Sequence, residues 1–257
     1  TIIFDDNLCQ ACQFAKTKKQ DIDWKAREKQ LRDLCDKYRS NDGSYDCIVP
    51  GSGGKDSFFT SHMLQNKYGM NPLTITWAPN MYTPWGIKNM ENWVNSGVDN
   101  TLLSPNRRVQ RLLTRLSVEN LLHPFQAFQF GQKYLAPRIA MRHNVELIFY
   151  GEHSSEYGNN LEESKTPIMN EDYFINDDVD SLFVGGVSHA DLKSKFGLRD
   201  IDLKHYKPLT TKEIGDSKIQ VHYFGFYEPW HPQGNYYYSV EHGGFITSPE
   251  RLSGTYT

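Results

Sequence analysis

The sequence of 257 residues predicts an α/β fold, in which a doubly wound and mostly parallel sheet carries helices on both faces. Short apolar stretches alternate along the chain with longer amphipathic stretches, which is the pattern of a parallel sheet covered on both sides. One of the short stretches, 145–152, has an entirely apolar middle. A strand buried on both faces has this composition.

The elements follow one another in alternation. We expect strands at 45–50, 73–77, 99–104 and 145–152, and helices at 57–68, 85–96, 107–122 and 132–143. Gly69 is a natural stop for the first of these helices. A further helix is expected at 21–39, where Trp24, Leu31 and Tyr38 repeat every seven residues. The pattern weakens after residue 160, and residues 221–245 are strongly aromatic.

These elements divide into three regions. Residues 1–42 form a small cysteine-containing segment and a helix, and they end at the turn signal Asp42-Gly43. Residues 43–210 form the main α/β domain, and residues 211–257 form an aromatic-rich segment that we expect to contact substrate. Because the first residue is Thr1, we expect the chain to be part of a longer protein.

Composition restricts the partners. A net charge of −3 provides no general attraction to nucleic acid, so no nucleic-acid partner is expected. No apolar run reaches the length of a membrane span, and no signal-peptide pattern occurs. Four cysteines without such a signal indicate a reduced, cytoplasmic location. Two of them, Cys35 and Cys47, occupy apolar positions and are expected to pack in the core.

The stretch CIVPGSGGKDSFF, residues 47–59, places a glycine-rich turn between a strand and a helix. Ligands bind at this end of strands in open α/β sheets. Glycines let successive N–H groups point into one concavity, and the helix adds its positive end. Lys55 adds a positive charge, and Ser52 and Ser57 add hydroxyl donors. The turn therefore predicts a phosphate site.

Three common glycine motifs do not fit this turn. A Walker A loop would need glycine at Val49 and serine or threonine at Asp56. The dinucleotide motif would need its third glycine at position 56, and a nucleophile elbow would need serine two residues after a glycine. What remains is S-G-G-K-D-S, from Ser52 to Ser57.

This hexapeptide resembles the PP-loop of the N-type ATP pyrophosphatases. Nearly the whole chain is similar to one family of that superfamily, the N-acetyl sugar amidotransferases of bacterial surface-sugar synthesis. The similarity lies in IDWKAREKQLRDL, TITWAPNMYTPWG, LTRLSVENLLHPFQAFQFGQ, LIFYGEHSSEYG, VGGVS and NYYYSVEHGGF. It implies a PP-loop fold and an enzyme that adenylates an acetamido oxygen, then replaces it with ammonia. The products would be an acetamidino sugar, AMP and pyrophosphate, in surface-glycan (lipopolysaccharide or O-antigen) biosynthesis.

The resemblance also implies the ligand set. ATP and its pyrophosphate would contact Ser52, Gly53, Gly54, Lys55, Asp56, Ser57, Thr76 and Trp77, although Trp77 could equally be core packing. The catalytic residues would be Lys55, Asp56, Glu152 and Glu156. Mg²⁺ would bind Asp56 and Glu156, while Glu152 would orient substrate or ammonia. The alternative is that Glu152 and Glu156 of YGEHSSEYG are surface loop residues without a role in catalysis or metal binding.

The sugar is expected to meet amide, charged and aromatic side chains. The candidates are Gln129, Gln132, Arg138, Tyr157, Tyr237 and Glu241. Core packing is the alternative for the tyrosines, and a surface ion pair is the alternative for Arg138. Because no glutaminase signature appears, ammonia is expected from a separate glutaminase that acts with a cyclase-like subunit.

Cys9 and Cys12 form a C-x-x-C pair, which is half of a structural zinc site. Relatives carry a further C-x-x-C upstream, so zinc would need ligands that precede this chain. C-x-x-C pairs also occur in tRNA-thiolating PP-loop enzymes, which are the alternative function. A non-catalytic nucleotide-binding protein would explain the loop but not the acids opposite it.

Overall fold

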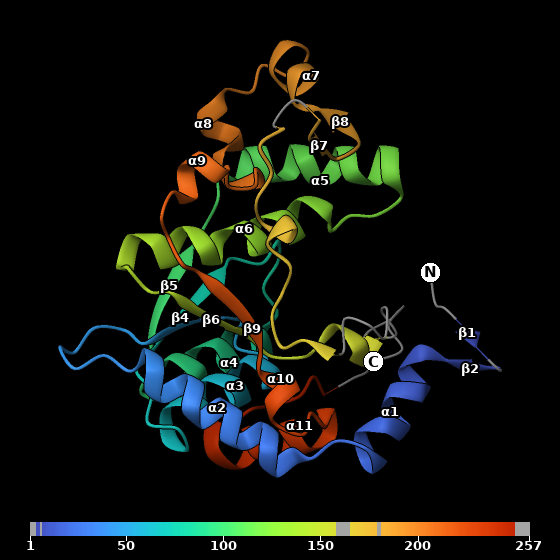
Figure 1. The fold of residues 1–257 in the computed structure, drawn as a ribbon. Helices are drawn as coiled ribbons and strands as arrows, with labels where there is room; N and C mark the ends of the chain where they lie inside the picture. Colours follow the sequence, from blue (N-terminus) through green and yellow to red (C-terminus); the bar gives the residue numbers. More distant parts are fainter. Residues whose placement is uncertain (1–3, 6, 158–164, 179–180, 250–257) are drawn as a thin grey trace.

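The computed structural model describes residues 4–5, 7–157, 165–178 and 181–249 (Figure 1). Its centre is a five-stranded sheet in the order β5-β4-β3-β6-β9, and every neighbouring pair in it is parallel. The strands are β3 (Cys47–Pro50), β4 (Pro72–Trp77), β5 (Asp99–Leu103), β6 (Leu147–Tyr150) and β9 (Gln220–Tyr223). The predicted fold class is confirmed, and β9 is a strand that the sequence patterns did not indicate.

The helices that precede or join the strands are α1 (Gln10–Gln20), α2 (Trp24–Tyr38), α3 (Lys55–Asn66), α4 (Pro84–Val94), α5 (Arg107–Leu121) and α6 (Gln126–His143). Helix α1 was not predicted, and α6 begins at Gln126, earlier than the predicted residue 132. Among the described residues, no helix has the length and apolar character that crossing a membrane requires.

The remaining elements are short, apart from α11. They are β1 (Phe4–Asp5), β2 (Leu8–Cys9), η1 (Ser154–Tyr157), η3 (Glu171–Tyr173), β7 (Phe183–Val184), β8 (Val187–Ser188), α7 (His189–Ser194), α8 (Asp200–Leu203), η4 (Lys204–Tyr206), α9 (Thr211–Ile214), α10 (Phe224–Tyr227) and α11 (Pro232–Gly243).

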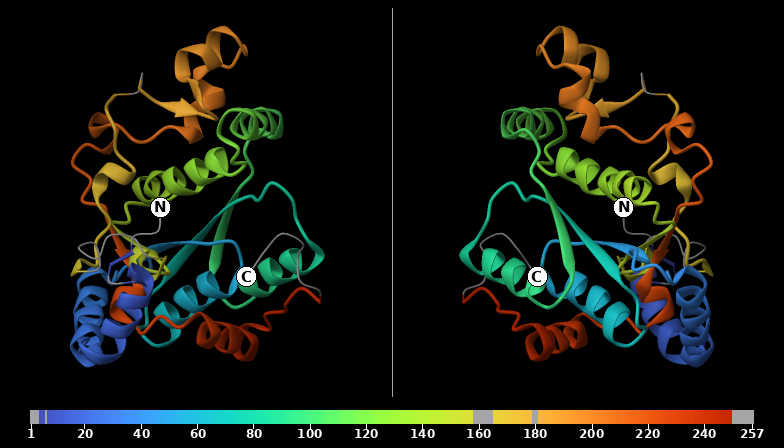
Figure 2. Two further views of the ribbon diagram at one scale, coloured as in Figure 1. Left: turned by 90° about the vertical axis from the view of Figure 1, so that its right-hand side faces the viewer. Right: turned by 90° about the vertical axis from the view of Figure 1, so that its left-hand side faces the viewer.

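Alternating strand residues build the two layers of core. Ile48 and Ile148 pack with residues of α5 and α6 on one face of the sheet. Val49 and Phe149, which are their next neighbours in sequence, pack with residues of α2, α3 and α10 on the other face. Figure 2 shows α5 and α6 on one side of the strands, and α2, α3, α4 and α11 on the opposite side. The sheet is therefore covered on both faces.

The segment predicted as a separate aromatic region, 211–257, belongs to this core as far as it is described. Its strand β9 pairs with β6, and its aromatic residues Phe224, Tyr227 and Trp230 are buried. Helix α11 lies so close to α3 that a Cβ on Gly243 would stand 2.8 Å from Cδ2 of Phe58. Most of the aromatic content thus serves packing.

The strand order locates the ligand crevice. From the central strand β3 the chain moves outward through β4 and β5, then returns to the other side of β3 through β6 and β9. The connections from β3 and from β6 leave in opposite directions, which opens a crevice at their carboxyl ends. The S-G-G-K-D-S turn follows β3 and the acidic stretch GEHSSE follows β6. Both motifs therefore meet at this crevice.

We expect the stability of the fold to fall between pH 6.5 and 4 because of His222. This buried side chain of β9 lies 2.7 Å (Nδ1) from the Tyr227 hydroxyl and 3.2 Å (Nε2) from the Gln220 amide oxygen. Burial lowers its pKa to about 4, from 6.5. In that window the unfolded chain binds a proton that the folded chain does not, so acid favours unfolding by about 3 kcal/mol.

Urea unfolding at a series of pH values measures this effect. In His222→Gln, the free energy of unfolding should fall less steeply between pH 6.5 and 4. Replacing the exposed His123 by Gln should leave this pH dependence unchanged. If the free energy of unfolding of His222→Gln falls as steeply with acid as that of wild type, then groups other than His222 cause the acid sensitivity.

Candidate active site

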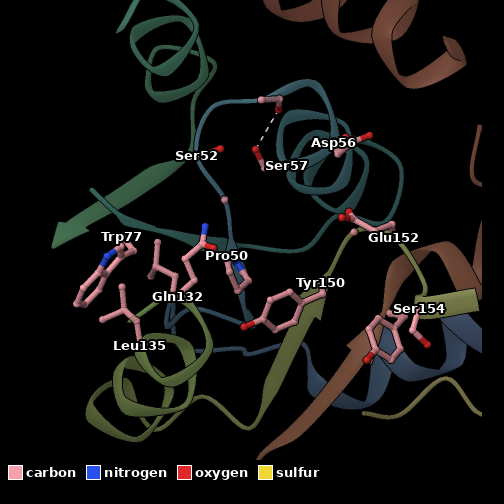
Figure 3. Close-up of a pocket in the computed structure, with 15 residues that line it drawn as sticks. Pro50, Ser52, Asp56, Ser57, Trp77, Gln132, Leu135, Tyr150, Glu152 and Ser154 are labelled. Carbon is pink, nitrogen blue, oxygen red and sulfur yellow. Dashed lines mark hydrogen bonds between the residues drawn. The ribbon is translucent and has the colours of Figure 1, made fainter. Parts of the chain in front are cut away.

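A cavity of about 470 Å³ lies at the crevice (Figure 3). The turn after β3 contributes Ser52 and Gly54, and the first turn of α3 contributes Asp56 and Ser57. The opposite walls come from β4, α6, β6 and β9 and the turn after β6, with Ile75, Trp77, Gln132, Leu135, Tyr150, Glu152, Ser154 and Tyr223. Its size and its mixture of apolar wall and polar turn suit a small-molecule ligand.

The start of α3 leaves donors facing this cavity. The helix begins at Lys55 after the N-cap residue Gly54, and no side chain caps it. The first N–H groups of an α-helix lack partners within the helix, so an uncapped end offers them to a ligand. These donors and the helix dipole together favour an anion. The structure thus places the predicted phosphate loop on a cavity.

Two carboxylates line the cavity beside this helix end. Asp56 comes from the first turn of α3, and Glu152 comes from the turn after the adjacent strand β6. Figure 3 shows both on the same side of the cavity. Neither residue is close in sequence to the other, and the parallel pairing of β3 with β6 brings them together.

Glu156, which was predicted as the Mg²⁺ ligand, lies in an ion pair instead. The Lys18 ammonium of α1 donates to its two carboxylate oxygens at 2.7 and 2.8 Å, and to the Trp230 carbonyl at 2.7 Å. The Glu156 side chain is 14% exposed and is not part of the cavity wall. Of the two candidate acids, the structure puts Glu152 at the cavity. Glu156 connects η1 to α1.

Lys55 and Gly53 are also absent from the cavity wall. The Lys55 ammonium pairs with the Asp56 carboxylate beside it. Gly53 shapes the turn, because its φ of +80° is a conformation that other residues rarely adopt.

Trp77 is a core residue that also lies on the cavity wall. It is 3% exposed and packs in the main core, with its ring 5.6 Å from that of Tyr206, and it also lines the cavity. Its indole nitrogen is buried without a hydrogen-bond partner among the described residues. Thr76 is not on the cavity wall, and its hydroxyl accepts from the Asn100 amide at 3.2 Å.

Gly131→Ala is expected to push Trp77 out of this position. A Cβ at residue 131 would overlap the indole, standing 2.6 Å from Cδ2. We expect a loss of about 1–3 kcal/mol in stability from this overpacking. The displaced ring should also weaken binding of a nucleotide in the cavity.

Thermal unfolding and titration with an ATP analogue measure the two effects. Gly234→Ala in α11 is the matched control, because its Cβ would meet nothing closer than 3.5 Å. Normal stability and binding in Gly131→Ala would show that the ring can move without consequence.

Among the six predicted substrate residues, the described structure brings Gln132 to the cavity. Gln129 is exposed, and Tyr237 and Glu241 are exposed on α11. Arg138 is nearly buried elsewhere and donates to the carbonyls of Lys207 and Pro208 at 3.2 Å each. It also pairs with the Glu213 carboxylate at 3.4 Å, so Arg138 is engaged in an ion pair and is not on the wall of this cavity. The side chain of Tyr157 lies outside the described residues.

Sequence reasoning missed Tyr150, Ser154 and Tyr223. Tyr150 and Tyr223 end the neighbouring strands β6 and β9, and they pair in register. Recognising QVHY as a strand would have indicated both tyrosines at the same edge. Burial raises the pKa of Tyr150, so its hydroxyl remains protonated at neutral pH.

Cys9 and Cys12 lie together at the start of α1. The Cys12 N–H lies 3.4 Å from Sγ of Cys9. This backbone hydrogen bond lowers the pKa of the Cys9 thiol, and the hydrogen bond between the thiols raises that of Cys12. No group of three or more histidine, cysteine or acidic side chains within the described ranges is arranged to hold a metal. Cys35 and Cys47 are buried in the core, and burial raises the pKa of Cys35 to about 12.

A scan against protein-family models finds no match, and a search of curated proteins finds none. Among solved structures, the chain is similar to a U34-tRNA thiolase, NcsA, from Methanococcus maripaludis with its 4Fe-4S cluster. The identity is 10% and the TM-score 0.41, over 90% of this chain and 69% of that one.

Two further structures are similar at the same level. An NH₃-dependent NAD synthetase from Campylobacter jejuni has 11% identity and a TM-score of 0.39, over 72% of this chain and 78% of that one. An NMN synthetase from Francisella tularensis has 13% identity and a TM-score of 0.36, over 90% and 100%. Similarity this low assigns no function, which has to be inferred from the residues of the cavity.

Proposed function

We propose that this chain is an ATP-dependent amidotransferase that converts the acetamido group of an N-acetylated sugar into an acetamidino group. The observation that carries the proposal is the S-G-G-K-D-S turn. It ends in an uncapped helix start at the cavity, where its own Asp56 and Glu152 of the turn after β6 both lie on the wall. Phosphate oxygens suit the helix end, and the acidic pair suits a metal–nucleotide complex.

The reaction begins with an activation step. The acetamido oxygen attacks the α-phosphorus of ATP, the bond to the bridging oxygen breaks, and pyrophosphate leaves. Negative charge grows on the pyrophosphate, where the N–H groups at the start of α3 stabilise it. Lys55 contributes positive charge from beside Asp56. Adenylation turns a poorly leaving amide oxygen into part of AMP.

Asp56 and Glu152 are the residues that would hold Mg²⁺, since carboxylate oxygens are its preferred protein ligands. A bound Mg²⁺ would supply neutralisation of phosphate charge. A carboxylate next to a phosphate is otherwise repelled by it, so the position of Asp56 in the phosphate turn agrees with this assignment.

Ammonia completes the reaction by attacking the imidate carbon, and AMP departs with the former amide oxygen. The Gln132 amide and the Tyr150 hydroxyl lie on the cavity wall and can orient the sugar's polar groups. Ammonia would come from a separate glutaminase that acts with a cyclase-like subunit.

A structural zinc ion forms part of the proposal for the longer protein. Cys9 and Cys12 are adjacent at the start of α1, which suits two of the four positions of a tetrahedral site. The other ligands would lie outside this chain.

Phosphorus NMR of the protein with ATP, Mg²⁺, ammonium and a panel of N-acetylated sugars tests the proposal. We expect sugar-dependent AMP and pyrophosphate, and a product in which NH replaces oxygen. ADP and phosphate would contradict the assigned phosphate loop. AMP release with tRNA and a sulfur donor, but not with sugars, would favour a tRNA-thiolating enzyme.

A further inference from the structure

Helix α11 places a buried amide against the acidic side chain of the phosphate turn. The Asn235 Nδ2 donates to Asp56 Oδ1 at 3.1 Å, across 179 positions of sequence. Asn235 is only 2% exposed. We propose that Asn235 is a positioning residue, which fixes the Asp56 carboxylate in the orientation that serves the metal–nucleotide complex. This inference rests on the function proposed above.

The two oxygens of Asp56 meet different partners. Oδ1 accepts from Asn235 on α11, while Oδ2 pairs with the ammonium of Lys55, its neighbour on α3. The Lys55 side chain is 31% exposed and flexible, so a lysine alone would hold the carboxylate loosely. The buried amide supplies a second and more rigid attachment.

The amide itself is held by regular structure. Ser239, one turn further along α11, has its Oγ 2.9 Å from the Lys55 carbonyl and 2.7 Å from the Asn235 carbonyl. Ser239 is fully buried, and its contact connects α11 directly to the first turn of α3. A donor carried by a packed helix is oriented more accurately than one carried by a loop.

The chemistry of the amide suits this task. Asparagine donates a hydrogen bond without adding charge, so Asp56 keeps its negative charge for a cation. A carboxylate at position 235 would repel Asp56, and an ammonium there would add a second positive charge to that of Lys55 and repel a metal cation. Removing the amide leaves the Asp56 oxygen without its buried donor.

Calorimetric binding of α,β-methylene-ATP, with and without Mg²⁺, tests the inference without requiring turnover. In Asn235→Ala we expect the Mg²⁺-dependent gain in affinity to fall about tenfold, as for other residues that orient metal ligands. Affinity without Mg²⁺ should stay unchanged. Asn235→Leu fills the space of the amide without its donor, and it provides the same measurement if the alanine variant does not fold.

Two comparisons separate positioning from general stability. Gln110→Ala removes another amide that is 2% exposed, on α5, and should reduce stability while keeping the Mg²⁺ dependence. When Asp56 is already replaced by Asn, adding Asn235→Ala should not change the Mg²⁺ dependence of binding any further, since Asn235 acts through Asp56.

Wild-type Mg²⁺ dependence in the Asn235 variants, or an equal loss in the Asp56→Asn background, would overturn the inference and leave the proposed function intact. If the wild-type protein itself does not bind the analogue, both the proposed function and this inference fail.

Discussion

Glu152→Gln is expected to lower ATP-dependent turnover by about 100-fold or more, because it removes one of two carboxylates at the phosphate turn. The amide keeps the shape of the side chain but cannot supply the negative charge that a divalent cation requires. The fold should be retained, since Glu152 is a half-buried residue of a turn at the cavity. Rates of pyrophosphate release at saturating ATP measure the effect.

Glu156→Gln is the matched comparison, at an acid four residues further along, in η1. It weakens the ion pair with Lys18, which is largely shielded from solvent, so we expect lower thermal stability with turnover within a few-fold of wild type. The reverse result, with Glu156→Gln inactive and Glu152→Gln active, would restore Glu156 as the metal ligand. That result would mean that α1 releases Glu156 when substrate binds.

Gly53→Ala is expected to abolish nucleotide binding and to destabilise the protein. A side chain at φ +80° is strained by about 1–2 kcal/mol. Its Cβ would also stand 2.7 Å from Cα and 2.9 Å from N of Met90. These are backbone atoms of α4 and cannot rotate away, so the turn must shift. Its N–H groups would then no longer converge on the cavity.

Gly54→Ala is the matched control for the loss of stability, because it adds the same methyl group at the neighbouring residue without strain or overlap. Its Cβ would meet nothing closer than Ser52 Oγ at 3.8 Å, and Gly54 has a φ of −72°. We therefore expect wild-type thermal stability. Differential scanning calorimetry, with and without the ATP analogue, compares the two variants. A Gly53→Ala protein that melts and binds like wild type would show that the turn adapts to the added methyl group.

Helix α1 of the N-terminal segment contacts the residues that follow the cavity-lining turn after β6. Lys18 contacts both η1, which follows Glu152, and the Trp230 carbonyl just before α11. The buried ring of His153 packs 4.7 Å from that of Tyr223 on the other side of the same turn. Thus α1 and β9 contact the turn after β6 and η1, and Lys18 also connects α1 to the segment before α11.

The sequence by itself predicted the fold class and the glycine-rich turn between β3 and α3, which the structure places on the cavity. The alternation of apolar strands with helices is a local pattern, and the S-G-G-K-D-S turn lies within six residues of the chain. The glycines, the helix end and its backbone N–H groups all lie within one short stretch, so a local pattern is enough to predict an anion site there. Asp56 belongs to this same stretch, so the sequence also predicted its place beside the turn, and the structure puts it on the cavity wall.

Only the tertiary structure decided which other residues join this turn. The resemblance favoured Glu156 as the Mg²⁺ ligand, whereas the structure pairs Glu156 with Lys18, 138 positions away, and puts Glu152 on the cavity wall. Arg138 is engaged by carbonyls of a segment about seventy positions later. Asn235 reaches Asp56 because α11 packs on α3. Such contacts depend on how distant elements pack, and no local pattern of residue types encodes that packing.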